Sequence, residues 1–171
     1  MENPRPGAIF IGAGGNLPHP LPGPPRETLE AALHALERHG VQLVRISPWY
    51  RTAPVPASDQ PWFVNAVAEV ASGLDPRALL AALHAVEHDF GRVRSVPNAP
   101  RIVDLDLLDF RGEVAAGGGQ APVLPHPRLH QRAFVLRPLA DLEPQWRHPV
   151  GGHPIATLLA ALPAGQRVER F

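Results

Sequence analysis

Residues 101–110 read Arg-Ile-Val-Asp-Leu-Asp-Leu-Leu-Asp-Phe, and this alternation of apolar and acidic residues predicts a β-strand. Successive side chains point to opposite faces of a strand, so Val103 and Leu105 face a core while Asp104 and Asp106 share the other face. With a rise of about 3.4 Å per residue, the two carboxylates lie about 7 Å apart along the strand. Neighbouring acids beside an apolar face repel each other and lose hydration unless positive charge compensates them.

Magnesium is the natural compensating charge, because Mg²⁺ takes one or two carboxylates and accepts phosphate oxygens in its other positions. Arg92, Arg94 and Arg101 lie just upstream, and arginine suits bidentate recognition of phosphate. Acids for a metal and arginines for phosphates together indicate phosphoryl-group transfer. Taken alone, however, an Asp-x-Asp strand is more often an exposed face paired with arginines, so both interpretations stay open at this point.

Composition narrows the class of protein. At 171 residues the chain is long enough for one domain with a substantial core, and we expect a single domain over residues 1–171. The formal net charge is zero, which argues against a broad basic surface for nucleic acid. Lysine and cysteine are absent, which excludes a P-loop lysine, a Schiff-base lysine, disulfides and thiol nucleophiles. The chain shows no signal-peptide pattern and no apolar run of about 18 residues, so we expect a cytoplasmic monomer without membrane association.

Periodicity and turn residues predict an ordered series of elements. They are strand 8–13, helix 27–39, strand 41–46, strand 63–71, helix 76–90 with Asp75 as its N-cap, strand 101–110 and a short helix near 155–162. The first six follow a β-α-β-β-α-β order, which is typical of an α+β ferredoxin-like sandwich, an antiparallel sheet with helices on one face. Two long loops, Thr52–Pro61 and Gly91–Pro100, are typical of binding sites. We interpret residues 144–171 as edge packing.

Three further features carry candidate chemistry. Phe63 and Asn65 share one face of the 63–71 strand and could bind a planar, hydrogen-bonding ring, although spacing alone favours an ordinary half-buried face. His84 and His88 are four residues apart on a helix, but no third ligand is in register for a metal. His126 stands between two prolines, which suits a phosphate contact, whereas a lone histidine is more often structural.

Together these residues resemble the signature of the 6-hydroxymethyl-7,8-dihydropterin pyrophosphokinase family of folate synthesis. Five segments carry the resemblance, in this order: Thr52-x-Pro54; Gln60-Pro61-x-Phe63-x-Asn65-Ala66; Gly91-Arg92-Val93-Arg94; Pro100-Arg101-x-x-Asp104-Leu105-Asp106; Pro125-His126-Pro127 followed by Arg132-x-Phe134-Val135-Leu136. It departs from the family where Asn98-Ala99 replace a common Trp-Gly pair. The resemblance implies ATP as pyrophosphoryl donor and a pterin alcohol as acceptor.

The resemblance also implies roles for individual residues. Asp104 and Asp106 would hold two Mg²⁺ ions that bridge the triphosphate, and the catalytic cations would be Arg92 and Arg101. Nucleotide binding would fall to His84, Glu87, Arg94, His126 and Arg132. The pterin slot would be formed by Thr52, Val55 through its backbone, Phe63, Asn65 and Phe134.

Two other classes of function stay open. Another Mg²⁺-dependent phosphoryl or nucleotidyl transferase would share the acids and arginines but not the pterin slot. A non-catalytic ferredoxin-like module, including an RNA-binding one, would need a basic surface and exposed aromatic residues on its strands, and the zero net charge and single tyrosine argue against it.

Overall fold

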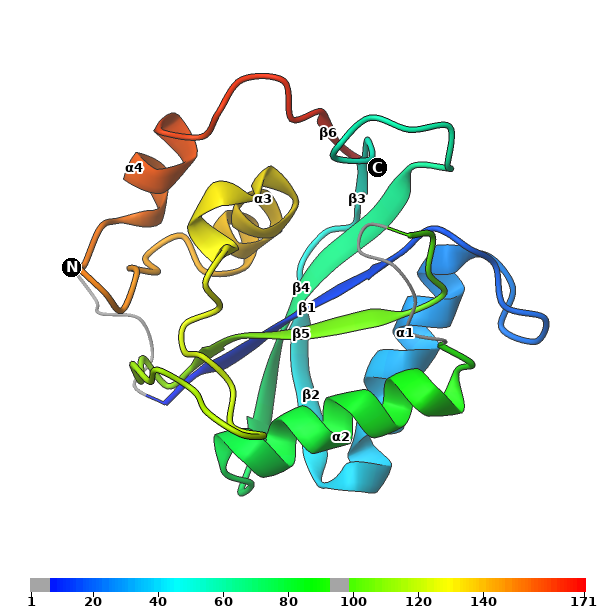
Figure 1. Cartoon of the computed structure of the whole chain (residues 1–171), viewed down its shortest axis with the longest axis horizontal. Coiled ribbons are helices and arrows are strands. Elements are labelled where there is room, and N and C mark those ends of the chain that lie inside the picture. Colours follow the sequence, from blue (N-terminus) through cyan, green and yellow to red (C-terminus); the bar gives the residue numbers. More distant parts are fainter. Residues whose placement is uncertain (1–6, 93–98) are drawn as a thin grey trace.

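The computed structural model describes residues 7–92 and 99–171, and within them six strands form one antiparallel sheet. The strands are β1 (Ile9–Gly15), β2 (Val41–Ile46), β3 (Tyr50–Thr52), β4 (Phe63–Ser72), β5 (Asp104–Phe110) and β6 (Val168–Arg170). Their order across the sheet is β5-β1-β4-β3-β6, and β2 pairs with β4 further along the same edge as β3 (Figure 1). The predicted strands are present, and the expected 41–46 strand stops before Pro48 and resumes as β3.

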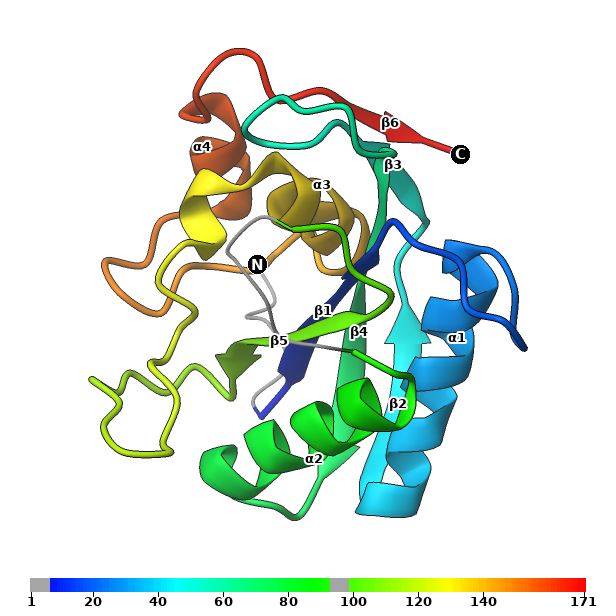
Figure 2. The ribbon, with the colours of Figure 1, turned by 45° about the vertical axis from the view of Figure 1, so that its right-hand side comes forward.

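Helices cover both faces of the sheet, so the expectation of helices on one face is wrong. The helices are α1 (Pro25–Ala35), extended by a 3-10 turn at Leu36–His39, α2 (Pro76–Asp89), α3 (Ala133–Leu142), α4 (Ile155–Ala160) and a 3-10 turn at Leu129–Gln131. Figure 2 shows α1 and α2 on one side of the sheet and α3 and α4 on the other. The central strands are apolar on both faces, and a second layer buries the face that a one-sided sandwich would leave in water.

Two separate cores result from this arrangement. Ile9, Ile11 and Ala68 pack with α1 and α2, whereas Phe10 and Val67 on the same strands pack with α3 and Trp146. β4 is therefore buried on both faces, and the expected half-buried face of this strand is wrong. None of the helices in the described ranges has the length and apolar character needed to cross a bilayer.

A β-bulge in β5 sets the direction of its acidic residues. Phe10 pairs with Asp109 and Ile11 pairs with Leu107, so Leu108 is an extra residue in β5. Before the bulge, Asp104 and Asp106 point to the face that carries α3, and Val103, Leu105 and Leu107 are buried against α1 and α2, as predicted. After the bulge Asp109 points to the α3 face as well, where its carboxylate accepts a hydrogen bond of 2.8 Å from Trp146 Nε1.

Local sequence signals explain where α2 begins and ends. The side chain of Asp75 accepts a hydrogen bond of 2.8 Å from the backbone N–H of Ala78, and Pro76 occupies the first helical position, where its missing N–H costs nothing. After the C-cap residue Phe90, Gly91 adopts a φ of 82°, a left-handed conformation that favours glycine. The N-cap predicted at Asp75 is confirmed.

Asp75→Ala is expected to lower the free energy of unfolding by about 1 kcal/mol, because it removes the acceptor for an N–H group of the first turn. Asp75→Ser keeps an acceptor and should recover most of that loss. Urea denaturation of the three proteins, followed by circular dichroism, measures the difference. Equal midpoints for Asp75→Ala and the parent chain would contradict the role of this cap.

Candidate functional site

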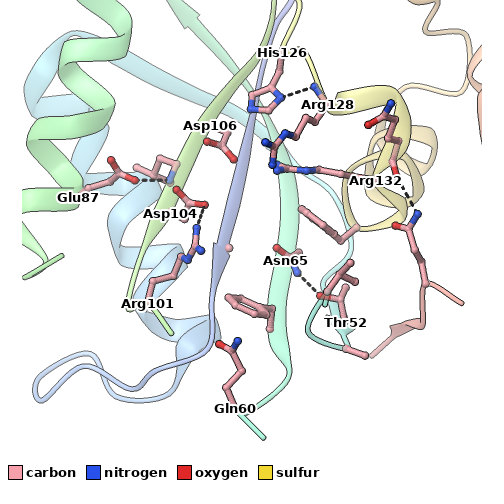
Figure 3. Close-up of a pocket in the computed structure, with 18 of the residues that line it drawn as sticks. Thr52, Gln60, Asn65, Glu87, Arg101, Asp104, Asp106, His126, Arg128 and Arg132 are labelled. Atoms are coloured by element: carbon pink, nitrogen blue, oxygen red, sulfur yellow. Dashed lines mark hydrogen bonds and ion pairs between the residues drawn. The ribbon is translucent and has the colours of Figure 1, made fainter. Parts of the chain in front are cut away.

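A cavity of about 640 Å³ gathers residues from β1, β3, β4, β5, α2 and α3, and its volume lies in the range of ligand-binding pockets. Every predicted site residue within the described residues lines it: Thr52, Val55, Phe63, Asn65, His84, Glu87, Arg92, Arg101, Asp104, Asp106, His126, Arg132 and Phe134. The predicted Arg94 and the departure at Asn98 lie outside the described residues. Figure 3 shows the acids of β5 on one side of this cavity and Arg128 and Arg132 facing them.

Asp104 is the centre of a charged cluster at the edge of the sheet. Its Oδ1 accepts a hydrogen bond of 2.5 Å from Arg92 Nη1, and its Oδ2 accepts one of 2.9 Å from Arg101 Nη1. Arg92 also donates to Glu87, whose Oε2 accepts a bond of 2.9 Å from the backbone N–H of Leu105. The end of α2 is thereby fastened to the outer edge of β5.

The two carboxylates of β5 have opposite electrostatic environments. Burial opposes ionisation of Asp104, but Arg92 and Arg101 outweigh it and lower the pKa of this carboxyl. Burial, followed by repulsion from Asp104, raises the pKa of Asp106 to about 7, and the attraction of Arg132 does not offset these effects. Such a carboxyl favours an added cation, since a positive charge beside it would stabilise the ionised form.

A basic wall faces these acids from the loop before α3. The backbone N–H of His126 donates to Leu108 O at 2.9 Å, which fixes the histidine beside β5. Burial, and then repulsion from Arg132, lowers the pKa of His126 to about 4, so the ring is neutral at pH 7. Its Nδ1 accepts a bond of 3.2 Å from the N–H of Arg128 and therefore leaves the proton on Nε2. A neutral donor and two guanidinium groups suit a polyphosphate.

A flatter, less charged compartment lies beside β3 and β4. Asn65 is buried, and its Nδ2 donates a hydrogen bond of 2.7 Å to Thr52 Oγ1. Phe63 and Phe134 line the same cavity, and each ring carries an arginine, Arg101 and Arg132, with Cζ at 5.8 and 5.3 Å from the ring centroid. Aromatic rings beside a polar amide suit a planar ligand with hydrogen-bonding edges.

Gly14 at the end of β1 makes room for that amide. A Cβ at this position would lie 2.5 Å from Asn65 Oδ1, a distance that real contacts do not show. At Gly12 in the same strand, a Cβ would meet Leu108 at an ordinary 3.5 Å. A side chain at position 14 would therefore displace the end of the Asn65 side chain, and glycine avoids this clash without an unusual backbone conformation.

Asn16 joins the two loops of the site, a role that sequence analysis missed. It is 2% exposed, and its Nδ2 donates to Gln60 Oε1 and to Pro61 O, both at 2.9 Å. Its Oδ1 accepts a bond of 3.0 Å from the N–H of Arg101. Asn16 thus holds the loop before β4 and the segment before β5 against the end of β1. A Gly-Gly-Asn turn signals a loop, but nothing local to it shows that the amide is buried.

Other lining residues were also missed. Arg128 and Gln131 precede α3, and Pro163–Gln166 come from the segment after α4. Edge packing was predicted for that segment, and β6 does pair with β3. The residues before β6 nevertheless form part of the cavity, because the chain crosses α3 on its way to the sheet edge (Figure 1). No periodic pattern in the sequence predicts such a crossing.

Comparison of the sequence with family models and with individual proteins gives the same result. The sequence model of the family described as 7,8-dihydro-6-hydroxymethylpterin-pyrophosphokinase (HPPK) matches residues 10–144. A Pseudomonas aeruginosa relative, named 2-amino-4-hydroxy-6-hydroxymethyldihydropteridine pyrophosphokinase, is 45% identical over 164 residues, covering 95% of this chain and 96% of the relative. A relative of the same name from Methylorubrum extorquens is 36% identical over 163 residues, covering 94% of this chain and 98% of its own length.

Solved structures share the fold at low identity. The structure of HPPK-DHPS from Plasmodium falciparum matches with a TM-score of 0.71 at 15% identity, and the match covers 94% of this chain and 44% of that one. An HPPK-DHPS solved in complex with substrates matches with a TM-score of 0.66 at 12% identity, covering 91% of this chain and 45% of that one. This chain therefore spans less than half of those two solved chains, and at such identities the likeness concerns the fold alone. By the family match and its two close relatives, the chain belongs to the 7,8-dihydro-6-hydroxymethylpterin-pyrophosphokinase family.

Proposed function

We propose that this chain uses the cavity on β5 to transfer the pyrophosphoryl group of ATP to 6-hydroxymethyl-7,8-dihydropterin, giving AMP and the pterin diphosphate in folate biosynthesis. Membership of the family supports the reaction. One observation carries its assignment to this cavity: residues from Thr52 to Phe134, predicted separately for metal, nucleotide and pterin, all line the same space. The acids of β5 line one part of it and Asn65 another, and Arg101 and Arg132, which lie over Phe63 and Phe134, stand between the two parts.

We assign the binding of two Mg²⁺ ions to Asp104 and Asp106. The described residues contain no group of three or more His, Asp or Glu side chains placed to hold a metal ion. The two carboxylates would be the protein's ligands, and phosphate oxygens and water would complete the coordination. The raised pKa of Asp106 supports the fit, because a nearby cation would relieve its repulsion from Asp104. When bound, such ions supply polarisation of the phosphoryl oxygens.

Arg92 and Arg101 would change partners during this reaction. Both guanidinium groups donate hydrogen bonds to Asp104 in this structure. Each retains N–H groups that can donate to phosphate, and a cation at Asp104 would replace part of the attraction that holds them there. The arginines would then stabilise the charge that spreads over the transferred group in the transition state.

The remaining residues would orient the two substrates. His126 would donate from Nε2 to a phosphate oxygen, and Arg132 would hold the terminal phosphates opposite Asp106. Phe63 and Phe134 would enclose the pterin ring, with Asn65 hydrogen-bonding along its edge. The acceptor hydroxyl would attack the β-phosphorus in line, and a loose transition state of this kind requires no strong general base.

We further propose a single ferredoxin-like pyrophosphokinase domain over residues 1–171, acting as a cytoplasmic monomer. If β2 and β3, which both pair with β4, are counted as two parts of one interrupted strand, the elements up to β5 follow a β-α-β-β-α-β order, which supports the ferredoxin-like description. The helices α3 and α4 would be additions to it. The loop Ala53–Pro61 would close over the substrates and exclude water. The second loop expected to do so, Gly91–Pro100, lies for the most part outside the described residues.

The leaving group distinguishes this proposal from an ordinary kinase. We expect one AMP per turnover, formed only when a hydroxymethylpterin is present, with the β- and γ-phosphates of ATP both on the product. Chromatography of the nucleotides, with ATP labelled at the β- or γ-phosphate, measures this. Formation of ADP in proportion to the modified acceptor would contradict the proposal and favour another Mg²⁺-dependent transferase.

The two carboxylates of β5 should have opposite effects on stability. The pKa of Asp106 is about 4 in the unfolded chain, whereas burial and the neighbouring Asp104 raise it to about 7 in the folded protein. Between these values the folded state binds more protons than the unfolded chain, so the free energy of unfolding falls as the pH rises. Asp106→Asn should therefore make the metal-free protein more stable than the parent at pH 8, while turnover falls by orders of magnitude.

Asp104→Asn is the matched control for that change. The lowered pKa of Asp104 means that its ionised form stabilises the fold above the unfolded pKa, a contribution lost as the pH falls. Its removal should destabilise the protein at pH 8. Thermal denaturation in EDTA between pH 4 and 8 compares the three proteins. A lower melting temperature for Asp106→Asn than for the parent at pH 8 would contradict the repulsion between the two acids.

Gly14→Ala should weaken pterin binding without abolishing the fold. The added Cβ displaces the end of the Asn65 side chain, and we expect about a tenfold loss of affinity from misplaced edge hydrogen bonds, the scale of one to two such bonds. Gly12→Ala adds a methyl group to the same strand in ordinary contact and serves as the control. Calorimetric titration with 6-hydroxymethylpterin measures both. Equal affinities in the two variants would show that Asn65 does not contact the pterin.

A further inference from the structure

The C-terminal strap, defined here as residues 163–170, ties together two sides of the cavity and lies beyond the family match, which ends at residue 144. The strap leaves α4, passes α3 and ends in β6 beside β3 (Figure 2). Thr52 pairs with Val168, and the N–H of Ala53 donates to Arg167 O at 3.1 Å. The strap is therefore anchored to the sheet by backbone pairing, independently of its contacts with α3.

Gln166 makes the contact of the strap with the start of α3. Its Oε1 accepts a hydrogen bond of 2.8 Å from the backbone N–H of Ala133. Its Nε2 donates one of 2.9 Å to the carbonyl of Gln131. The two bonds engage the peptide groups on either side of Arg132, so both peptide planes that orient this residue are held by one distant side chain.

The start of α3 needs this support. Arg132 occupies the N-cap position, and its own side chain makes no capping bond. The N–H groups of a first turn have no partner within the helix, and a side-chain oxygen usually accepts from one of them. Gln166 Oε1 takes this role from a position 33 residues further along the chain. The side chain of Arg132 has only N–H donors and cannot cap these groups itself, and it faces Asp106.

We propose that Gln166 is a positioning residue for the reaction: by holding the peptides on both sides of Arg132, it aims Arg132 at the polyphosphate and places Phe134, two residues later, at the pterin. The ring of Phe134 lies under the guanidinium of Arg132, so the two side chains form one unit on the first turn of α3. This inference rests on the proposed function, because it assumes that Arg132 contacts the nucleotide.

A double-mutant cycle tests the proposal, with calorimetric titration of a non-hydrolysable ATP analogue in the presence of Mg²⁺ as the readout. Gln166→Ala should weaken binding about fivefold, the factor that corresponds to the net contribution of one hydrogen bond. In the Arg132→Ala background the same change should weaken binding less than about twofold, because the residue that Gln166 positions is gone. The pterin affinity of Gln166→Ala should fall as well, through Phe134.

Two comparisons separate positioning from general destabilisation. Gln166→Glu keeps an acceptor for Ala133 N–H but cannot donate to Gln131 O. It should recover part of the affinity that Gln166→Ala loses. Gln145→Ala removes the same group from an exposed site away from the cavity and should bind as the parent does. The melting temperature of Gln166→Ala should fall only by the small amount typical of a lost helix cap, since β6 keeps the strap on the sheet, and every variant should be fully folded at the titration temperature.

Each contrary result has a distinct meaning. Normal binding by Gln166→Ala, or an equal loss in both backgrounds, would overturn the positioning role and leave the proposed function intact. Normal binding by Arg132→Ala would contradict the nucleotide contact assigned under the proposed function, and the positioning role would fall with it.

Discussion

The rest of the site depends on one constraint: the negative charge of Asp104 is compensated by arginines, whereas that of Asp106 is not compensated to the same extent. Two partly buried acids on one strand face are tolerated because Arg92 and Arg101 neutralise Asp104, while Asp106 holds its proton up to about pH 7. Arg92 follows the end of α2 and Arg101 precedes the start of β5, so the two elements must meet at this point. The proposed cation site lies where the fold leaves the two acids unequally compensated.

Covering both faces of the sheet makes room for the two substrates. On one face, α1 and α2 complete a core and bring Glu87 to the edge of β5. On the other, α3 covers only part of the sheet, and the uncovered ends of β1, β4 and β5 form the floor of the cavity. At the end of β1, Gly14 leaves space for the side chain of Asn65, and Asn16 holds the two loops in place through its hydrogen bonds. The C-terminal strap closes the side that α3 alone leaves open.

Much of this was predictable because it depends on neighbours in the sequence. The alternation in residues 101–110 placed Asp104 and Asp106 on one face, and the cap at Asp75 and the glycine after α2 set the limits of that helix. The second helical layer was not predicted, since apolar residues on both faces of a strand show that both faces are buried but not which elements cover them. The bulge at Leu108 was missed for a similar reason, because it exists only relative to β1.

The sequence by itself determined the order of the first helices and of the longer strands, the residue types of the site and the family to which the chain belongs. It did so because strand alternation, helix caps and motif spacing are short-range properties of the chain. Only the tertiary structure decided that Asp104 is paired while Asp106 is not equally compensated, that Asn16 joins two loops and that Gln166 caps α3. These depend on contacts between residues up to 85 positions apart, whose burial and direction are set by packing.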